Sequence, residues 1–201
     1  MSKPAWNLVI VGVCGQGTLL ASKILGRLAL DAQSGVKVSE VHGMSQRGGS
    51  VITHVRVGEA VHAPLVSLGG ADYLISFEAL EAARAAAYLK PQGVAITNNQ
   101  RISPMPVITG AVAYPADPLK DAALAGHTVE AVDALALAVE AGSQKAVNLV
   151  LLGMLSRHLP FEDEAWKHAI ASSVPRSTMA VNIRAFEAGR NAVPSMAEKQ
   201  A

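Results

Sequence analysis

Three glycines near the start of the chain, Gly12, Gly15 and Gly17, lie between an apolar run and an apolar pattern of helical spacing. Glycines let the backbone turn sharply and approach a ligand closely. A helix that begins near Thr18 would direct free N–H groups and a positive dipole at the same turn. A phosphate, including that of a coenzyme, could therefore bind here, although the same glycines could serve only to turn the chain tightly.

The spacing of these glycines separates the turn from two nucleotide-binding motifs. Its order is G-x-x-G-x-G, whereas the dinucleotide fingerprint is G-x-G-x-x-G. Gly12 and Gly17 match the outer glycines of the NTPase phosphate loop, but Thr18 stands where that loop needs a lysine. Without the lysine, no side chain of the motif neutralises the β- and γ-phosphates, and this argues against nucleotide hydrolysis.

A second glycine-bearing loop, "VHGMSQRGGS", follows a strand expected at residues 36–42. Its polar side chains belong to His42, Gln46, Arg47 and Ser50. Ligands and partners of open α/β sheets gather at the carboxyl ends of strands, where this loop begins. Gly48–Gly49 would fold the backbone sharply and leave Arg47 free to bind a carboxylate or phosphate. A solvated turn is the alternative, but long glycine-rich turns often carry function.

The composition narrows the classes of protein to consider. Of the 201 residues, 50% are hydrophobic and 16% are charged, and the net charge of +1 gives no basic footprint for nucleic acid. The single cysteine, Cys14, cannot form an intrachain disulfide or supply a four-cysteine iron–sulfur cluster or zinc site, and we expect no metal site in this chain. No segment has the pattern of a signal peptide or a transmembrane helix, so a cytoplasmic protein without membrane contact is expected.

Strands alternate with helices up to about residue 140, and this predicts an α/β, Rossmann-like fold with a mostly parallel sheet. The first strand is expected at 7–12 and the first helix at 18–31, with Gly35 as its C-cap. Strict alternation over 51–57, followed by Gly58–Glu59, predicts an antiparallel hairpin added to the sheet.

The remaining segments predict a helical C-terminal part and one domain. Three prolines mark residues 101–117 as an irregular crossing, and the residues after about 140 have mostly helical patterns. No linker or repeat divides the chain, so we expect a single domain over 1–201, with 191–201 as a loose tail.

Three segments together carry a family resemblance: "VGVCGQGTLLASKILG", "VKVSEVHGMSQRGGSVITHVRVG" and "KAVNLVLLGML". In this order they resemble the gamma-type domain of the 2-oxoacid:ferredoxin oxidoreductases, from about Asn7 to about Gly189. Within the family the likeness is strongest to the beta subunits of the indolepyruvate-specific members. The family's usual turn, G-x-G-G-Q-G, has a glycine where this chain has Cys14, and that change makes the turn slightly less permissive.

The resemblance implies a subunit of an oxidoreductase that cleaves 2-oxo acids. Indolepyruvate members convert the 2-oxo acid and coenzyme A to an arylacetyl-CoA, carbon dioxide and reduced ferredoxin. By this likeness, thiamine diphosphate, Mg and [4Fe-4S] clusters belong to a large alpha subunit, and ferredoxin or another carrier accepts the electrons. The chain has the pair Asn98–Asn99 but no preceding GDG, so it lacks the thiamine-binding motif and is expected to be inactive alone.

The resemblance also assigns candidate residues to the two loops. Arg47 and His42 would lie at the edge of the active site as catalytic candidates. Coenzyme A phosphates would be cradled by Gly12, Gly15, Gln16, Gly17 and Thr18. The surface facing the alpha subunit would comprise His42, Gln46, Arg47, Gly48, Gly49, Ser50 and Asn148.

Other interpretations stay open at this point. Asn148, the polar residue of its apolar helix, could equally bond a nearby backbone group. The whole chain could be a stand-alone nucleotide-binding protein, as the glycine turn alone would suggest. It could also be a pure assembly subunit that binds no ligand.

Overall fold

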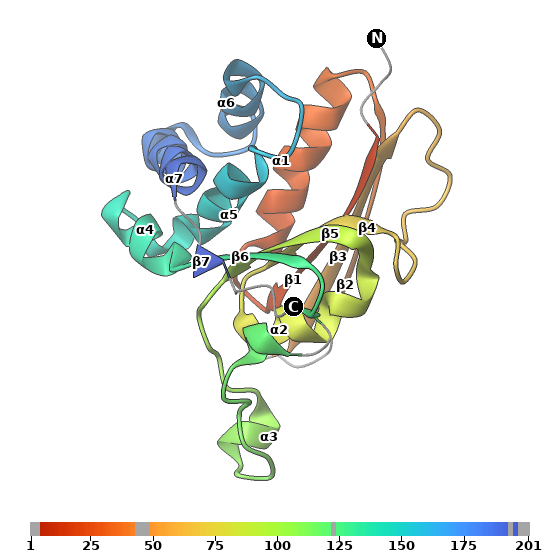
Figure 1. Ribbon diagram of the computed structural model, residues 1–201. Coiled ribbons are helices and arrows are strands. Elements are labelled where there is room, and N and C mark those ends of the chain that lie inside the picture. Colours follow the sequence, from red (N-terminus) through yellow and green to blue (C-terminus); the bar gives the residue numbers. More distant parts are fainter. Residues whose placement is uncertain (1–4, 43–48, 122–123, 193–194, 197–201) are drawn as a thin grey trace.

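The computed structural model describes residues 5–42, 49–121, 124–192 and 195–196 (Figure 1). The strands are β1 (Trp6–Val13), β2 (Gly35–His42), β3 (Ser50–Gly58), β4 (Ala71–Ser76), β5 (Leu89–Asn98), β6 (Thr128–Val132) and β7 (Ser195–Met196). The α-helices are α1 (Thr18–Asp31), α2 (Ala79–Ala85), α3 (Met105–Ile108), α4 (Ala134–Glu140), α5 (Val147–Leu155), α6 (Asp163–Ala171) and α7 (Met179–Asn191).

The strands described form one sheet in the order β2-β3-β1-β4-β5-β6-β7. β1, β4, β5 and β6 run parallel, β3 pairs antiparallel with both β1 and β2, and β7 pairs antiparallel with β6. The expected fold class is confirmed, and the segment expected as a loose tail contributes the short strand β7. The carboxyl ends of the four parallel strands lie at one edge of the sheet, and we call this the carboxyl edge.

The antiparallel hairpin lies one loop earlier than the sequence predicts. It is formed by β2 and β3, and the connection between them is the segment after His42 rather than Gly58–Glu59. The apolar alternation of β3 arises because this strand pairs on both sides, with β2 and with β1. At Gly58 the chain leaves the sheet, so the expected turn there is wrong.

The end of α1 also differs from the expectation. The residue with positive φ after this helix is Gln33, at 55°, whereas Gly35 already begins β2. A Cβ on Gly35 would lie 2.9 Å from the carbonyl oxygen of Gly58, so the close approach of β2 and β3 explains the glycine. Gly35 is therefore a strand-packing residue and not a helix cap.

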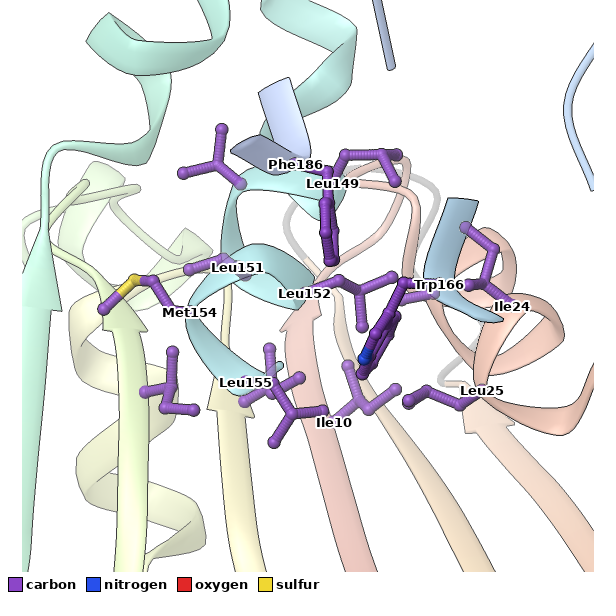
Figure 2. Close-up of a cluster of buried hydrophobic side chains, with 14 of the residues drawn as sticks. Ile10, Ile24, Leu25, Leu149, Leu151, Leu152, Met154, Leu155, Trp166 and Phe186 are labelled. Carbon is purple, nitrogen blue, oxygen red and sulfur yellow. The ribbon is translucent and has the colours of Figure 1, made fainter. Parts of the chain in front are cut away.

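The side chains of β1 alternate between two hydrophobic cores. Leu8 and Ile10 belong to the core on the face covered by α1, α5, α6 and α7, and Val9 and Val11 to the smaller core beneath α2. Burial on both faces is the reason that this strand reads as a continuous apolar run. In Figure 2, Trp166 of α6 and Phe186 of α7 pack against the leucines of α5. The ring centroids of Trp166 and Phe186 are 5.3 Å apart.

Two glycines allow α5 and α7 to pack with their backbones in close contact. A Cβ on Gly153 of α5 would overlap the carbonyl oxygen of Phe186, and a Cβ on Gly189 of α7 would overlap that of Val150. This crossing holds α5 rigidly against the helical layer. The amino end of α5, with Asn148, is thereby fixed beside the start of α1.

Candidate functional site

The glycine turn leaves β1 at the carboxyl edge and is held by the side chain of Gln16. Its Oε1 accepts a hydrogen bond from the amide of Val13 at 2.7 Å, and its Nε2 donates to the carbonyl of Phe77 at 3.3 Å. A Cβ on Gly12 would lie 2.9 Å from that Oε1 and 3.0 Å from the Cβ of Phe77. Gln16 therefore fixes the turn, and Gly12 leaves it the necessary room.

Gly15 and Gly17 both have φ of +92°, which is a conformation that side chains other than glycine rarely adopt. Their surroundings differ. A Cβ on Gly15 would meet nothing within 4 Å, whereas a Cβ on Gly17 would lie 3.0 Å from Nδ2 of Asn148. The glycine turn is thus open at Gly15 and closely packed at Gly17.

Asn148 is buried and connects α5 to the glycine turn. Its Nδ2 donates to the carbonyl of Gly17 at 3.4 Å, and its Oδ1 accepts from the amide of Leu149 at 3.0 Å. This is the backbone-bonding role that the sequence left open as the alternative. Its proposed contact with the alpha subunit stays a prediction.

The two glycine loops lie together at the carboxyl edge, where each follows the end of a strand. The amide of Cys14 donates to the carbonyl of Gly49 at 3.0 Å. The adjacent Ser50 donates its hydroxyl to Glu81 Oε2 of α2, and Arg84 pairs with Oε1 of the same carboxylate at 2.7 Å. Of the other predicted loop residues, His42 ends β2, and Gln46, Arg47 and Gly48 lie outside the described residues.

Thr18 belongs to a polar cluster that sequence reasoning missed. Glu40 of β2 accepts hydrogen bonds through Oε2 from Thr53 at 3.1 Å and from Thr18 at 3.5 Å. The three residues come from three different elements, so no spacing along the chain indicates the cluster. A carboxylate therefore lies next to the helix start that was expected to attract a phosphate.

A second missed cluster centres on Glu78, which is buried just after β4. Its Oε2 caps α2 by accepting from the amide of Glu81 at 2.9 Å, and its Oε1 accepts from the amide of Ile102 at 3.0 Å and from the hydroxyl of Tyr114. Burial and the neighbouring Glu78 raise the pKa of Tyr114 well above its ordinary value. The bond to Glu81 lies within the local sequence, whereas the contacts of Glu78 with Ile102 and Tyr114 carry no local sequence signal.

Asn98, compared above with a thiamine-binding pair, is fully buried at the end of β5. Its Nδ2 donates to the carbonyl of Phe77 at 3.3 Å and to Gln100 Oε1 at 3.2 Å, and its Oδ1 accepts from the amide of Ala134 at 3.1 Å. These bonds connect β5 to the start of α4. The polar atoms of Asn98 therefore serve the fold.

Among the residues that the structure describes, the glycine turn offers backbone groups more than side chains for binding. The first N–H groups of α1 have no acceptor within the helix, and no side chain caps this end at Gly17. Two residues earlier, the space around Gly15 is open. Within the described part of the chain, no group of three His, Cys, Asp or Glu residues could hold a metal ion. None of the helices described there is both long and apolar enough to cross a bilayer.

Comparison of the sequence with known families and relatives gives a match over nearly the full length. The family described as pyruvate ferredoxin/flavodoxin oxidoreductase matches residues 7–192. A relative from Thermococcus kodakarensis, named indolepyruvate oxidoreductase subunit IorB, is 46% identical over 196 residues, which cover 95% of this chain and 97% of the relative.

Solved structures share the fold. Pyruvate oxidoreductase subunit PORC from Thermotoga maritima superposes with a TM-score of 0.71 at 20% identity, covering 98% of this chain and 100% of that one. The 2-oxoglutarate:ferredoxin oxidoreductase from Magnetococcus marinus, solved with 2-oxoglutarate, coenzyme A and succinyl-CoA bound, gives a TM-score of 0.72 at 16% identity. That match covers 94% of this chain and 31% of the other, so the whole fold described above corresponds to one part of a longer chain.

Proposed function

The chain belongs to the pyruvate ferredoxin/flavodoxin oxidoreductase family as a small subunit of a 2-oxoacid:ferredoxin oxidoreductase, and from this membership we propose a specific reaction. Its complex converts an arylpyruvate such as indolepyruvate, together with coenzyme A, to arylacetyl-CoA and carbon dioxide, and passes two electrons to ferredoxin. The observation that carries the choice of substrate is the 46% identity, over nearly the whole of both chains, to a subunit named for indolepyruvate.

The catalytic cofactors of this reaction belong to a larger partner subunit. Thiamine diphosphate supplies the electron sink for decarboxylation of a 2-oxo acid, and iron–sulfur clusters relay the electrons. This chain has one cysteine, fewer than the four thiolates that such a cluster needs. The side-chain amide of Asn98 is hydrogen-bonded within the fold, so its oxygen is not directed at a magnesium ion. We therefore expect the chain to be inactive alone and to act in a cytoplasmic complex.

The small subunit contributes the carboxyl edge to the shared active site. Coenzyme A phosphates would meet the backbone from Gly15 to the first turn of α1, where the turn is open and the helix directs N–H groups outward. The side chains of Gln16 and Thr18 bond within the chain, so they shape this cradle and do not line it. Arg47 and His42, on the neighbouring loop and strand end, are proposed to contact the substrate side of the interface.

Reconstitution tests this proposal. The chain is co-expressed with a larger subunit that contains GDG and NN thiamine motifs and two ferredoxin-type cysteine runs. Indolepyruvate-dependent, coenzyme A-dependent viologen reduction is expected from the complex only, with kcat/KM for indolepyruvate above that for pyruvate or 2-oxoglutarate. Full activity of the large subunit alone, or a preference for pyruvate, would contradict it.

Two further measurements separate the alternatives. Calorimetry of the isolated chain with NAD and ATP should show no tight binding, because the glycine order and Thr18 match neither nucleotide motif. An Arg47→Ala complex should assemble but lose turnover. Normal turnover in that variant would instead favour a subunit that serves assembly only.

A further inference from the structure

A neutral arm leaves the sheet between β5 and β6. It runs from Arg101 to Asp117, and between these two residues its sequence, ISPMPVITGAVAYPA, contains no charged residue. Figure 1 shows the arm projecting away from the sheet, with the short helix α3 near its far end. A stretch of this length without charge is unusual on a protein surface, where charged side chains normally provide solubility.

The base of the arm is firmly held. Glu78 accepts hydrogen bonds from Ile102 on the outgoing segment of the arm and from Tyr114 on the returning segment. Arg101 donates to the carbonyl of Ala116 at 2.7 Å, and its guanidinium lies 5.8 Å from the centre of the Tyr114 ring. These contacts close the base from both sides, so the direction of the arm is fixed by the fold.

The far end of the arm exposes large apolar side chains. The exposed fractions are 50% for Met105, 65% for Ile108 and 56% for Val112. Pro104 and Pro106 flank Met105 and restrict the backbone there, which lowers the entropy lost when the arm is immobilised. A fixed projection with clustered apolar side chains has the properties of a protein-docking element.

Neither the remaining exposed apolar side chains of the described residues nor the hollow beside β1 matches the arm as a receptor in a second copy. Outside the arm, the exposed large apolar side chains of the described residues lie on α1, β2, the loop before β4, α4 and α7. They are Leu19, Leu30, Val38, Val41, Leu65, Leu68, Val139 and Met179. The hollow of about 320 Å³ beside the amino end of β1 is lined by charged side chains of Arg56, Glu59, Asp72 and Lys90. Lys90 pairs with Asp72 there and Arg56 donates to Asn7. Covering these charged groups with the apolar arm would remove them from water without adding a polar contact, so a second copy of this chain is a poor match.

The position of the arm indicates which partner it meets. It begins directly after β5, at the same carboxyl edge as the glycine turn, and Glu78 connects its base to α2, which also holds Ser50 of the second loop. The surface proposed to face the large subunit across the two loops therefore continues onto the arm. We infer that the arm inserts its apolar end into an uncharged, apolar groove of the large subunit and so anchors the two chains. This inference rests on the proposed function.

Matched charge substitutions test the inference on the assembled complex. Ile108→Asp and Val112→Asp place a carboxylate on the arm. Leu68→Asp and Val139→Asp place it at positions of similar exposure, 69% and 57%, away from the arm. The dissociation constant between the two subunits is measured by interferometry with immobilised large subunit, and circular dichroism verifies that each variant is folded.

The arm variants should weaken association at least tenfold, which corresponds to about 1.4 kcal/mol or more, and the two controls less than twofold. Association of both arm variants within twofold of the unmodified chain would overturn the inference. A loss of self-association by the small subunit alone would overturn it in favour of a second copy as the partner. If the unmodified chain does not bind the large subunit at all, the proposed function fails before the arm is tested.

Discussion

The glycine turn leaves β1 and the arm leaves β5, on either side of β4 and at the same edge of the sheet, but they use their side chains differently. At the turn, Gln16, Thr18 and Asn148 direct their polar groups at other parts of the same chain. The arm makes its polar contacts at its base and exposes Ile108 and Val112 at its end. The side chains of the glycine turn therefore mainly stabilise the turn itself. The arm, which has no recognisable motif, exposes apolar surface that the described residues leave uncovered.

This comparison suggests a division of work at the interface. A turn held rigidly by internal bonds can present backbone N–H groups at a fixed position to an anionic ligand. An apolar projection supplies binding free energy to a partner chain through burial of its side chains. On this view the turn positions a ligand and the arm holds the partner. Glu78 connects the base of the arm to α2, and α2 holds Ser50 next to the glycine turn.

The largest effect is expected from Glu78→Ala. The amides of Glu81 and Ile102 and the hydroxyl of Tyr114 would lose their acceptor together, at a cost of about 3–5 kcal/mol in the free energy of unfolding. Asp133→Ala, which removes the cap of α4 at Ala136, should cost only about 1 kcal/mol. Urea unfolding monitored by circular dichroism gives both values. Equal losses of unfolding free energy in the two variants would show that Glu78 does no more than an ordinary helix cap.

A smaller effect is expected at the glycine turn, where Gly17→Ala and Gly15→Ala form a matched pair with the same φ. Both substitutions carry the strain of a left-handed backbone, about 1 kcal/mol each. Gly17→Ala should cost about 1 kcal/mol more, because its Cβ would press on the buried amide of Asn148. Thermal unfolding of the two variants reports the difference, and equal midpoints would show that Asn148 does not constrain the turn.

Tyr114→Phe removes the hydrogen bond from Tyr114 to Glu78 at the base of the arm. The free energy of unfolding should fall by about 1 kcal/mol at neutral pH. Burial and Glu78 raise the pKa of Tyr114 in the folded chain, so ionisation occurs first in the unfolded chain, near the ordinary value of 10.0. The stabilisation is fully present below pH 10 and is lost as the pH rises above it. The unmodified chain should therefore lose stability more steeply above pH 10 than Tyr114→Phe does, and parallel pH profiles would contradict this.

The smallest effect is expected from Glu40→Gln, measured as coenzyme A affinity of the assembled complex. Glutamine keeps an acceptor oxygen for Thr53 and removes a negative charge beside the start of α1. If the turn holds a phosphate, the dissociation constant should fall roughly two- to fivefold. Glu59→Gln makes the same change of charge at the opposite edge of the sheet and should have no effect. An unchanged constant for Glu40→Gln would argue against a phosphate at the glycine turn.

Much of the fold could be predicted because burial imposes a period on the sequence. The continuous apolar run of β1 and the helical spacing of Ile24 and Leu28 gave both elements nearly to the residue. The position of the hairpin was missed because Gly58–Glu59 has residue types that favour a hairpin turn. The local sequence does not indicate that the strand before this turn pairs with β2 instead. Gly35 was misassigned for a similar reason, since its role depends on Gly58 across the sheet.

The candidate site was less predictable than the fold. The meeting of the two glycine loops followed from the topology, because the strand ends share one edge. The clusters around Glu40 and Glu78 could not be found, since Glu78 bonds residues that lie 24 and 36 positions away in the chain. The arm was expected only as an irregular crossing. Prolines and glycines indicate that a segment forms no regular helix or strand, but they do not indicate which of its side chains are exposed.

The central claim is that this chain completes an oxidoreductase whose redox cofactors lie in another subunit. Its most direct test is a titration of the purified chain into a fixed amount of the large subunit, following viologen reduction with indolepyruvate and coenzyme A. The account predicts negligible activity at the start, a linear rise, and saturation at a fixed molar ratio, with a break that Ile108→Asp moves to higher concentration. A rate that is already maximal without the small subunit would contradict it.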